Sequence, residues 1–257
     1  MHITSLQNPR IKSILRLRMK SRERQRGGLF LVEGADEIEL ALAAGHQPKT
    51  VVFAPDLTRH EIASVEGESL TVTPAIFRKL SLRERPDGWM AVFQRPVTSV
   101  EDLTLSTTPL VLLMESVEKP GNLGAVLRTA DAVGVDAVIV CDRRVDVYSP
   151  NVVRASRGAL LSVPVVELTS AEALGYLRAR RIRVVAANAN AGADYQEADL
   201  KGPIAIAMGT EDTGLSTIWL DEADIQVRIP MQGKINSLNV SVAAALLLYE
   251  ARRQRAT

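Results

Sequence analysis

The sequence predicts an α/β protein in which a small N-terminal domain precedes a larger domain built around a parallel β-sheet. Three observations support this fold class. Strand and helix patterns alternate along the chain. The strands of the second half are apolar on both faces, which is typical of a parallel sheet that is covered on both sides. Residues 98–108 are rich in Thr and Ser, so we expect domains at 1–97 and 109–257 joined by this linker.

In the N-terminal domain, a basic helix precedes alternating strands and helices. Apolar residues at helical spacing indicate the helices, runs of β-branched and aromatic residues indicate the strands, and Gly and Pro separate them. We expect helices over 8–25, 35–45, 59–65 and 74–81, and strands over 28–34, 50–55, 69–73 and 88–94.

The C-terminal domain starts with an apolar strand, a polar loop and a helix, and this order then recurs. The last element is a long alanine-rich helix. We expect strands over 109–116, 135–142, 163–168, 182–188, 202–209 and 225–230, and helices over 123–134, 149–161, 170–181 and 237–254.

Composition excludes several classes of protein. The chain has 257 residues, of which 46% are hydrophobic, so it can bury a sizeable core. Cys141 is its only cysteine and its three histidines are scattered, which argues against an internal disulfide and against a zinc site. The longest apolar runs are far shorter than the roughly 20 residues that span a bilayer. We therefore expect a cytoplasmic protein with no metal and no membrane partner.

The net charge is only +1, but basic residues gather near the start of the chain. One acid, Glu23, interrupts them. Such a run is either a phosphate-binding element for RNA or a solvated helix face. It comprises Arg10, Lys12, Arg16, Arg18, Lys20, Arg22, Arg24 and Arg26.

Three polar, Gly-containing loops, at 118–128, 208–216 and 229–239, follow strands of the C-terminal domain. Ligands bind at the carboxyl ends of strands in open α/β sheets, so the three loops could converge on one site. The second loop has the glycine spacing of a phosphate-binding loop, but Leu215 replaces its lysine. Glu211 and Asp212 would also repel phosphates, so we reject that interpretation.

Each loop also has an ordinary structural explanation. Asn122 and Ser237 could simply cap helices, and the turn at 209–216 could simply join a strand to a helix. Arg154 and Arg157, three residues apart on an expected helix, could be solvated or could grip a phosphate backbone. The chain lacks the glycine fingerprint of dinucleotide-binding folds and the nucleophile elbow of hydrolases.

Taken in this order, the three loops resemble the motifs of the SpoU/TrmH family of RNA ribose 2'-O-methyltransferases, a branch of the SPOUT superfamily. The resemblance covers residues 109 to 253 and is most specific over 229–250. The N-terminal part resembles a ribosomal-protein-like RNA-binding domain. The resemblance implies a deep trefoil knot in the C-terminal domain, a homodimer that completes the active sites, and S-adenosylmethionine (SAM) as cofactor.

The resemblance also assigns roles to individual residues. One departure is Lys119, which precedes Pro120 where the family often has Asn or Asp. Because a guanidinium stays protonated, we expect Arg128 to bind the target phosphate and stabilise a developing alkoxide rather than act as a base. The implied catalytic residues are Asn122, Arg128, Glu211, Ser237 and Asn239. The implied cofactor-binding residues are Asn188, Met208, Gly209, Gly214, Ile229, Met231, Ser237 and Leu238, and Arg154 and Arg157 would join the basic run in binding RNA.

The favoured substrate is large-subunit (23S) ribosomal RNA, because the extra N-terminal domain is more typical of that branch. Transfer RNA is the alternative substrate. A noncatalytic RNA-binding or ribosome assembly factor on the same fold is the alternative class. The sequence does not identify the modified nucleotide, and it does not distinguish ribosome maturation from antibiotic resistance.

Overall fold

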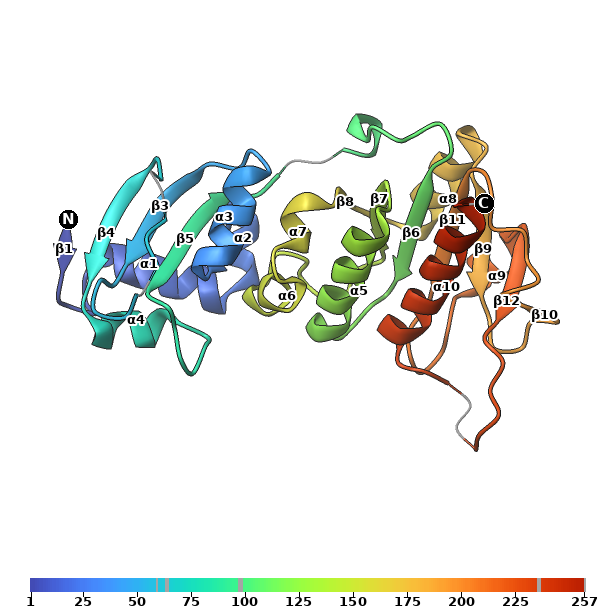
Figure 1. Cartoon of the computed structure of the whole chain (residues 1–257). Coiled ribbons are helices and arrows are strands. Elements are labelled where there is room, and N and C mark those ends of the chain that lie inside the picture. Colours follow the sequence, from blue (N-terminus) through green and yellow to red (C-terminus); the bar gives the residue numbers. More distant parts are fainter. Residues whose placement is uncertain (59, 63–64, 97–98, 235–236, 257) are drawn as a thin grey trace. The chain divides into compact units, whose positions relative to one another are not determined.

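The computed structural model describes residues 1–58, 60–62, 65–96, 99–234 and 237–256. Its backbone contacts divide the chain into two compact units (Figure 1). The first unit combines Met1–Val97 with Asp146–Ser162, and the second combines Thr98–Val145 with Val163–Thr257. The domain limits expected from the sequence stay a proposal, and each unit is described by itself.

The first unit contains a five-stranded mixed sheet in the order β1-β4-β3-β5-β2. Strand β5 is antiparallel to both of its neighbours, and the other pairs are parallel. The strands are β1 (His2–Ile3), β2 (Leu29–Glu33), β3 (Pro48–Phe53), β4 (Glu68–Val72) and β5 (Trp89–Gln94). The helices are α1 (Pro9–Met19), α2 (Ser21–Gly27), α3 (Ala35–Ala43), α4 (Pro74–Leu80), α6 (Pro150–Ser156) and α7 (Ala159–Ser162).

The single basic helix expected over 8–25 is two helices. Asn8 caps α1 by accepting from the Arg10 backbone N–H, and α1 ends where Lys20 adopts an extended conformation. The expectation of a helix around 59–65 is also wrong for residues 60–62 and 65, which are not helical. Residues 59 and 63–64 of that segment lie outside the described residues.

The helix expected over 149–161 is likewise broken. Arg157 and Gly158 both have left-handed backbone conformations, with φ of 51° and 93°, and they separate α6 from α7. A Cβ on Gly158 would collide with the side chain of Leu40 on α3. Tyr148, just before α6, packs against Phe30 of β2 with 5.1 Å between ring centroids. These contacts explain why segment 146–162 belongs to the first unit.

The second unit contains a seven-stranded sheet, parallel throughout, in the order β10-β12-β9-β11-β6-β7-β8. Sequence periodicity missed the two short elements β10 and α9. The strands are β6 (Leu110–Glu115), β7 (Ala137–Cys141), β8 (Val165–Leu168), β9 (Arg183–Ala187), β10 (Ala193–Asp194), β11 (Ile204–Met208) and β12 (Ile225–Arg228). The helices are α5 (Pro120–Val133), α8 (Ser170–Ala179), α9 (Thr217–Glu222) and α10 (Val240–Arg255).

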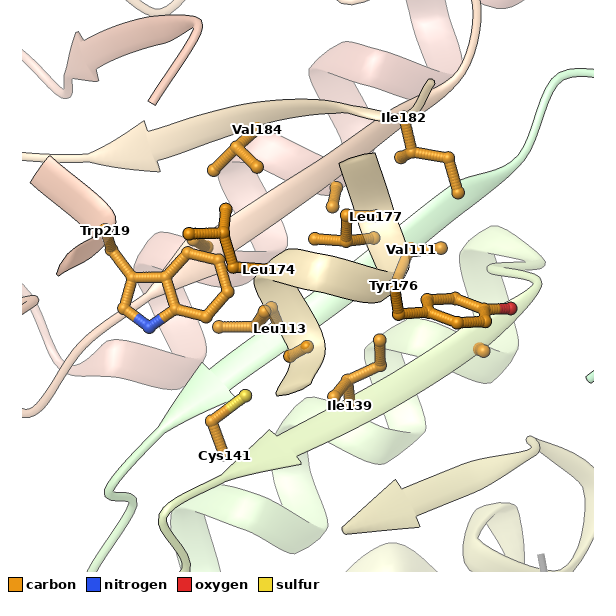
Figure 2. Close-up of a cluster of buried hydrophobic side chains, with 14 of the residues drawn as sticks. Val111, Leu113, Ile139, Cys141, Leu174, Tyr176, Leu177, Ile182, Val184 and Trp219 are labelled. Atoms are coloured by element: carbon orange, nitrogen blue, oxygen red, sulfur yellow. The ribbon is translucent and has the colours of Figure 1, made fainter. Parts of the chain in front are cut away.

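Helices cover both faces of this sheet, as the apolar strands predict. On one face, Trp219 of α9 and Leu174 of α8 pack over strand residues such as Leu113 (Figure 2). On the other face, α5 and α10 pack together. The expected linker takes part in the first of these cores, because it forms a 3₁₀ turn at Val100–Asp102 and buries Val100 and Leu103.

The trefoil knot implied by the resemblance stays a proposal. The segment between β12 and α10, which the knot would involve, includes residues 235 and 236, and these lie outside the described residues.

Candidate active site

Loops that follow the parallel strands form a cleft of about 480 Å³ at the carboxyl edge of the second sheet. Such a volume suits a small organic ligand. The lining comes from the ends of β9, β11 and β12 and from the segment that leads into α10. It includes Asn188, Met208, Gly209, Gly214, Ile229, Met231, Ser237 and Leu238, which are the expected cofactor-binding residues.

The chemistry of this lining fits SAM. Apolar side chains such as Met208, Ile229 and Leu238 offer surface for an adenine ring. Asn188 is held in place because its side-chain amide donates to Gln226 Oε1 at 2.9 Å and its backbone N–H donates to Val227 O. Among the described residues that line the cleft, only Arg228 has a basic side chain, and it pairs with Asp194. The cleft is therefore poorly suited to phosphates.

The loop at 209–216 closes on itself beside this cleft. Thr210 and Gly214 exchange two backbone hydrogen bonds, each 3.1 Å long. A Cβ on Gly209 would run into the Gly214 carbonyl and the Leu215 nitrogen, so only glycine fits there. Leu215, at the position of a phosphate-binding lysine, is buried in the hydrophobic core. The loop is therefore a packed turn without a cation for phosphate.

Glu115 fixes the far end of this loop, a role that sequence reasoning missed. Its buried carboxylate accepts from the Ser216 backbone N–H at 2.7 Å and from the Ser216 hydroxyl at 2.5 Å. It also accepts from Ser170, whose hydroxyl in turn accepts from the indole N–H of Trp219. The available signal was a carboxylate that ends an otherwise apolar strand.

Glu211 is the centre of a polar cluster that joins all three loops, the third of them through Asn239 at the start of α10. Its carboxylate accepts from the side chains of Lys119 and Asn122, on the loop and helix that follow β6. It also accepts from Asn239 Nδ2 at 3.1 Å, and the same amide donates to Asn122 Oδ1 at 3.2 Å. Three of the expected catalytic residues, Asn122, Glu211 and Asn239, thus lie in direct contact.

Two helix N-termini face this carboxylate. Lys119 is the N-cap residue of α5, and Asn239, rather than Ser237, is the N-cap residue of α10. Backbone N–H groups at helix N-termini favour negative charge. The ion pair with Lys119, followed by the hydrogen bonds from Asn122 and from the Val240 backbone, lowers the pKa of Glu211. With four donors around it, Glu211 is a poor proton acceptor.

A second cavity of about 270 Å³ adjoins the cofactor cleft. The segment from Gly209 to Thr213 lines both of them, so it forms a wall that the two ligand-sized spaces share. The second cavity is also lined by Lys119, Asn122 and Arg144. Arg144 pairs with Glu118, at 2.6 Å between guanidinium and carboxylate.

Two other expected catalytic residues lie outside the cluster. Ser237 lines the cofactor cleft but is exposed. Arg128 is exposed on α5 and lines neither the cofactor cleft nor the adjoining cavity. It lies six residues beyond Asn122, and six residues turn a helix through about 240° beyond one full rotation. Within one chain, Arg128 therefore lies about 120° around the helix and about 9 Å along it from Asn122, outside the cluster.

The first unit holds the expected RNA-binding residues. Arg154 and Arg157 are exposed there, and six of the eight residues of the basic run are exposed as well. Arg24 does not fit the expectation that the whole basic run binds RNA, because its side chain is only 6% exposed and pairs with Asp146 at 2.7 Å. Arg18 is also engaged, since it donates to the carbonyls of Lys79 and Leu80.

An exposed apolar stripe runs along α10. Val242, Leu246 and Tyr249 recur at intervals of four and three residues, and Tyr249 is 55% exposed. They line a surface hollow of about 410 Å³ together with Tyr195. A contiguous exposed apolar surface of this kind is typical of an interaction face.

No helix in the described part of the chain has both the length and the apolar character needed to cross a membrane. The described residues likewise contain no group of three His, Cys, Asp or Glu side chains that could hold a metal ion.

The fold and the site define the class of protein: an α/β enzyme that binds a small organic cofactor at the carboxyl edge of a parallel sheet. The chain belongs to the SpoU rRNA methylase family, whose model matches residues 109–249. A model of the MRM3-like substrate binding domain matches residues 8–91.

Relatives are similar over nearly the whole chain. The 23S rRNA (guanosine(2553)-2'-O)-methyltransferase RlmP of Bacillus subtilis is 30% identical over 97% of this chain and 98% of its own. The 23S rRNA (uridine(2479)-2'-O)-methyltransferase of Streptomyces viridochromogenes is 33% identical over 91% of this chain and 85% of its own. The crystal structure of the SpoU methyltransferase AviRb from the same organism, in complex with the cofactor AdoMet (SAM), aligns with a TM-score of 0.90. It is 32% identical and covers 98% of this chain and 99% of its own.

Proposed function

We propose that this protein transfers a methyl group from SAM to a ribose 2'-hydroxyl of 23S rRNA. The observation that carries the proposal is the shared wall at Gly209–Thr213, which places the Glu211 cluster beside the cofactor cleft. Two full-length relatives are named as 23S rRNA 2'-O-methyltransferases. Such a substrate would also place the reaction in the cytoplasm.

In this proposal the protein contributes position rather than covalent chemistry. SAM supplies an activated methyl on a cationic sulfonium when it is bound. The residues of the cleft hold the cofactor. The Asn122 amide keeps one N–H after it donates to Glu211, and this group would orient the ribose. Asn239 spends both of its amide hydrogens on Asn122 and Glu211, so its role is to hold Asn122 in place. Because Glu211 already accepts from four donors, we assign it an organising role and not that of a general base.

We infer that Arg128 acts in a homodimer. It lies outside the cluster of its own chain, so it reaches an active site only if that site is built between protomers. The α10 stripe of Val242, Leu246 and Tyr249 offers the apolar surface that a self-complementary interface needs.

We propose that the first unit binds the RNA through its exposed basic residues. Lys12, Arg16, Lys20, Arg22 and Arg26 are exposed on α1, on α2 or at their junction. Each phosphate that they neutralise releases counterions, so binding should weaken as salt rises. Replacing Lys12 and Arg16 by Glu should lower RNA affinity and flatten this salt dependence without changing SAM affinity.

The experiment that tests the function is methyl transfer from labelled SAM to purified 23S rRNA, 16S rRNA and tRNA, followed by mapping of ribose methylation. We expect a single 2'-O-methylated nucleotide in 23S rRNA. Methylation of tRNA alone would show that the substrate is tRNA and not 23S rRNA. Binding of RNA without any transfer would support a noncatalytic assembly factor instead.

A further inference from the structure

Lys119, directly before Pro120, contacts the centre of the site. Its ammonium pairs with one oxygen of Glu211, while Asn122 and Asn239 donate to the other oxygen. The two oxygens thus divide their donors: one faces the lysine and the other faces the two amides. Lys119 therefore sets the rotation of the carboxylate on which both amides depend.

We propose that Lys119 is a positioning residue for methyl transfer, acting through Glu211 to hold Asn122 and Asn239 in their working orientation. The inference rests on the proposed function. Without Lys119, the Glu211 carboxylate could rotate about its last bond and release either amide. A shift of about 1 Å in a positioning group is enough to slow a reaction by about 100-fold.

The charges around this pair indicate that Lys119 acts on Glu211 and does not bind an RNA phosphate. Besides Lys119 and Glu211, the charged residues that line the cavity are Glu118, Asp212 and Arg144, and Arg144 is engaged by Glu118. Acidic residues thus outnumber basic ones, so the cavity repels phosphate more than it attracts it. The same negative surroundings, with Glu211 as the main cause, raise the pKa of Lys119 and keep it charged.

A purely structural role for Lys119 does not fit its position. Its side chain is 68% exposed, and exposed ion pairs contribute little to stability. Replacing it should therefore leave the fold intact and change the reaction alone.

The test compares full-length variants in steady-state methyl transfer to 23S rRNA, at low and high salt. The set is Lys119→Met, Lys119→Arg, Glu211→Gln and the double variant Lys119→Met with Glu211→Gln. Lys201→Met is the matched control, because it removes one exposed lysine just before β11, outside the linings of the cofactor cleft and the adjoining cavity. Thermal unfolding of every variant verifies that each one folds.

We expect Lys119→Met to lower kcat by at least about tenfold with KM for RNA changed less than about twofold. Lys119→Arg should recover most of kcat, and the double variant should be no slower than Glu211→Gln, because both changes disrupt the same contact. The inference is overturned if the loss appears in KM for RNA and disappears at high salt, or if the two losses multiply. It is also overturned if Lys119→Met matches the unaltered protein. Inactivity of the unaltered protein on every RNA would instead refute the proposed function.

Discussion

Gly209→Ala tests whether the turn beside the cofactor cleft tolerates any displacement. The added methyl would lie closer than 3.0 Å to the backbone of Gly214 and Leu215, whereas ordinary contacts of a Cβ are 3.4–4 Å. The methyl would meet backbone atoms, so the clash is removed only if the loop moves by about 1 Å. Extra methyl groups in tightly packed sites lower the free energy of unfolding by about 1–3 kcal/mol. The loop that moves carries Glu211, so we expect about a 100-fold loss of methyl transfer.

The assay combines calorimetric titration with SAM, methyl transfer to 23S rRNA and thermal unfolding. Gly175→Ala is the matched control: it lies mid-helix in α8, with nothing within 4 Å of an added Cβ, and should stabilise the protein by about 0.5–1 kcal/mol. A folded Gly209→Ala protein that binds SAM and methylates RNA normally would refute the reasoning.

Three further predictions concern other parts of the chain. Arg24→Met leaves the buried carboxylate of Asp146 without its ion-pair partner, so the free energy of unfolding, measured by urea titration, should fall by about 3 kcal/mol. Arg22→Met, at an exposed position, should change it little. Burial raises the pKa of the Cys141 thiol, so a thiol reagent at pH 8 should label it only after unfolding. The free energy of unfolding should also fall above about pH 8.5, because there the unfolded chain loses this proton and the folded chain keeps it. Tyr249→Asp should give monomers in light scattering and abolish methyl transfer; an active monomer would contradict the dimer proposal.

Regular apolar patterns were sufficient to predict most of the fold. The strands of the second sheet are short apolar runs between Gly, Pro or polar residues, and such runs need no tertiary information to be recognised. The break at Lys20 could not be predicted, because lysine is not a helix breaker. The break at Arg157 and Gly158 had a local signal in the glycine, which the helical pattern of the flanking residues masked. At Gly158 the left-handed φ of 93° favours glycine, and an added Cβ would also displace the end of the Leu40 side chain, 118 residues away in sequence.

The gathering of the three loops at one edge of the sheet could be predicted for a similar reason. The expected cofactor-binding residues all line one cleft, since loops after parallel strands meet at one edge. The contact between Lys119 and Glu211 joins residues 92 apart, and no local pattern indicates it. The separation of Arg128 from Asn122, about 120° around the helix and about 9 Å along it, follows in contrast from helical geometry alone and could have been predicted from their spacing. The burial of Arg24 could not, because its partner Asp146 lies far along the chain.

The junction of α5 and α10 at Glu211 has a consequence for synthesis of the protein. Asn122 leaves the ribosome 117 residues before the Asn239 to which it is bonded. At about 5–20 residues per second, the 28 residues from Glu211 to Asn239 take about 1–6 seconds to add, and until then the Glu211 carboxylate lacks the donor from Asn239. A chain that stops short of α10 keeps its basic helices but not the completed cluster. If the first unit binds RNA as proposed, such a fragment would occupy RNA without modifying it.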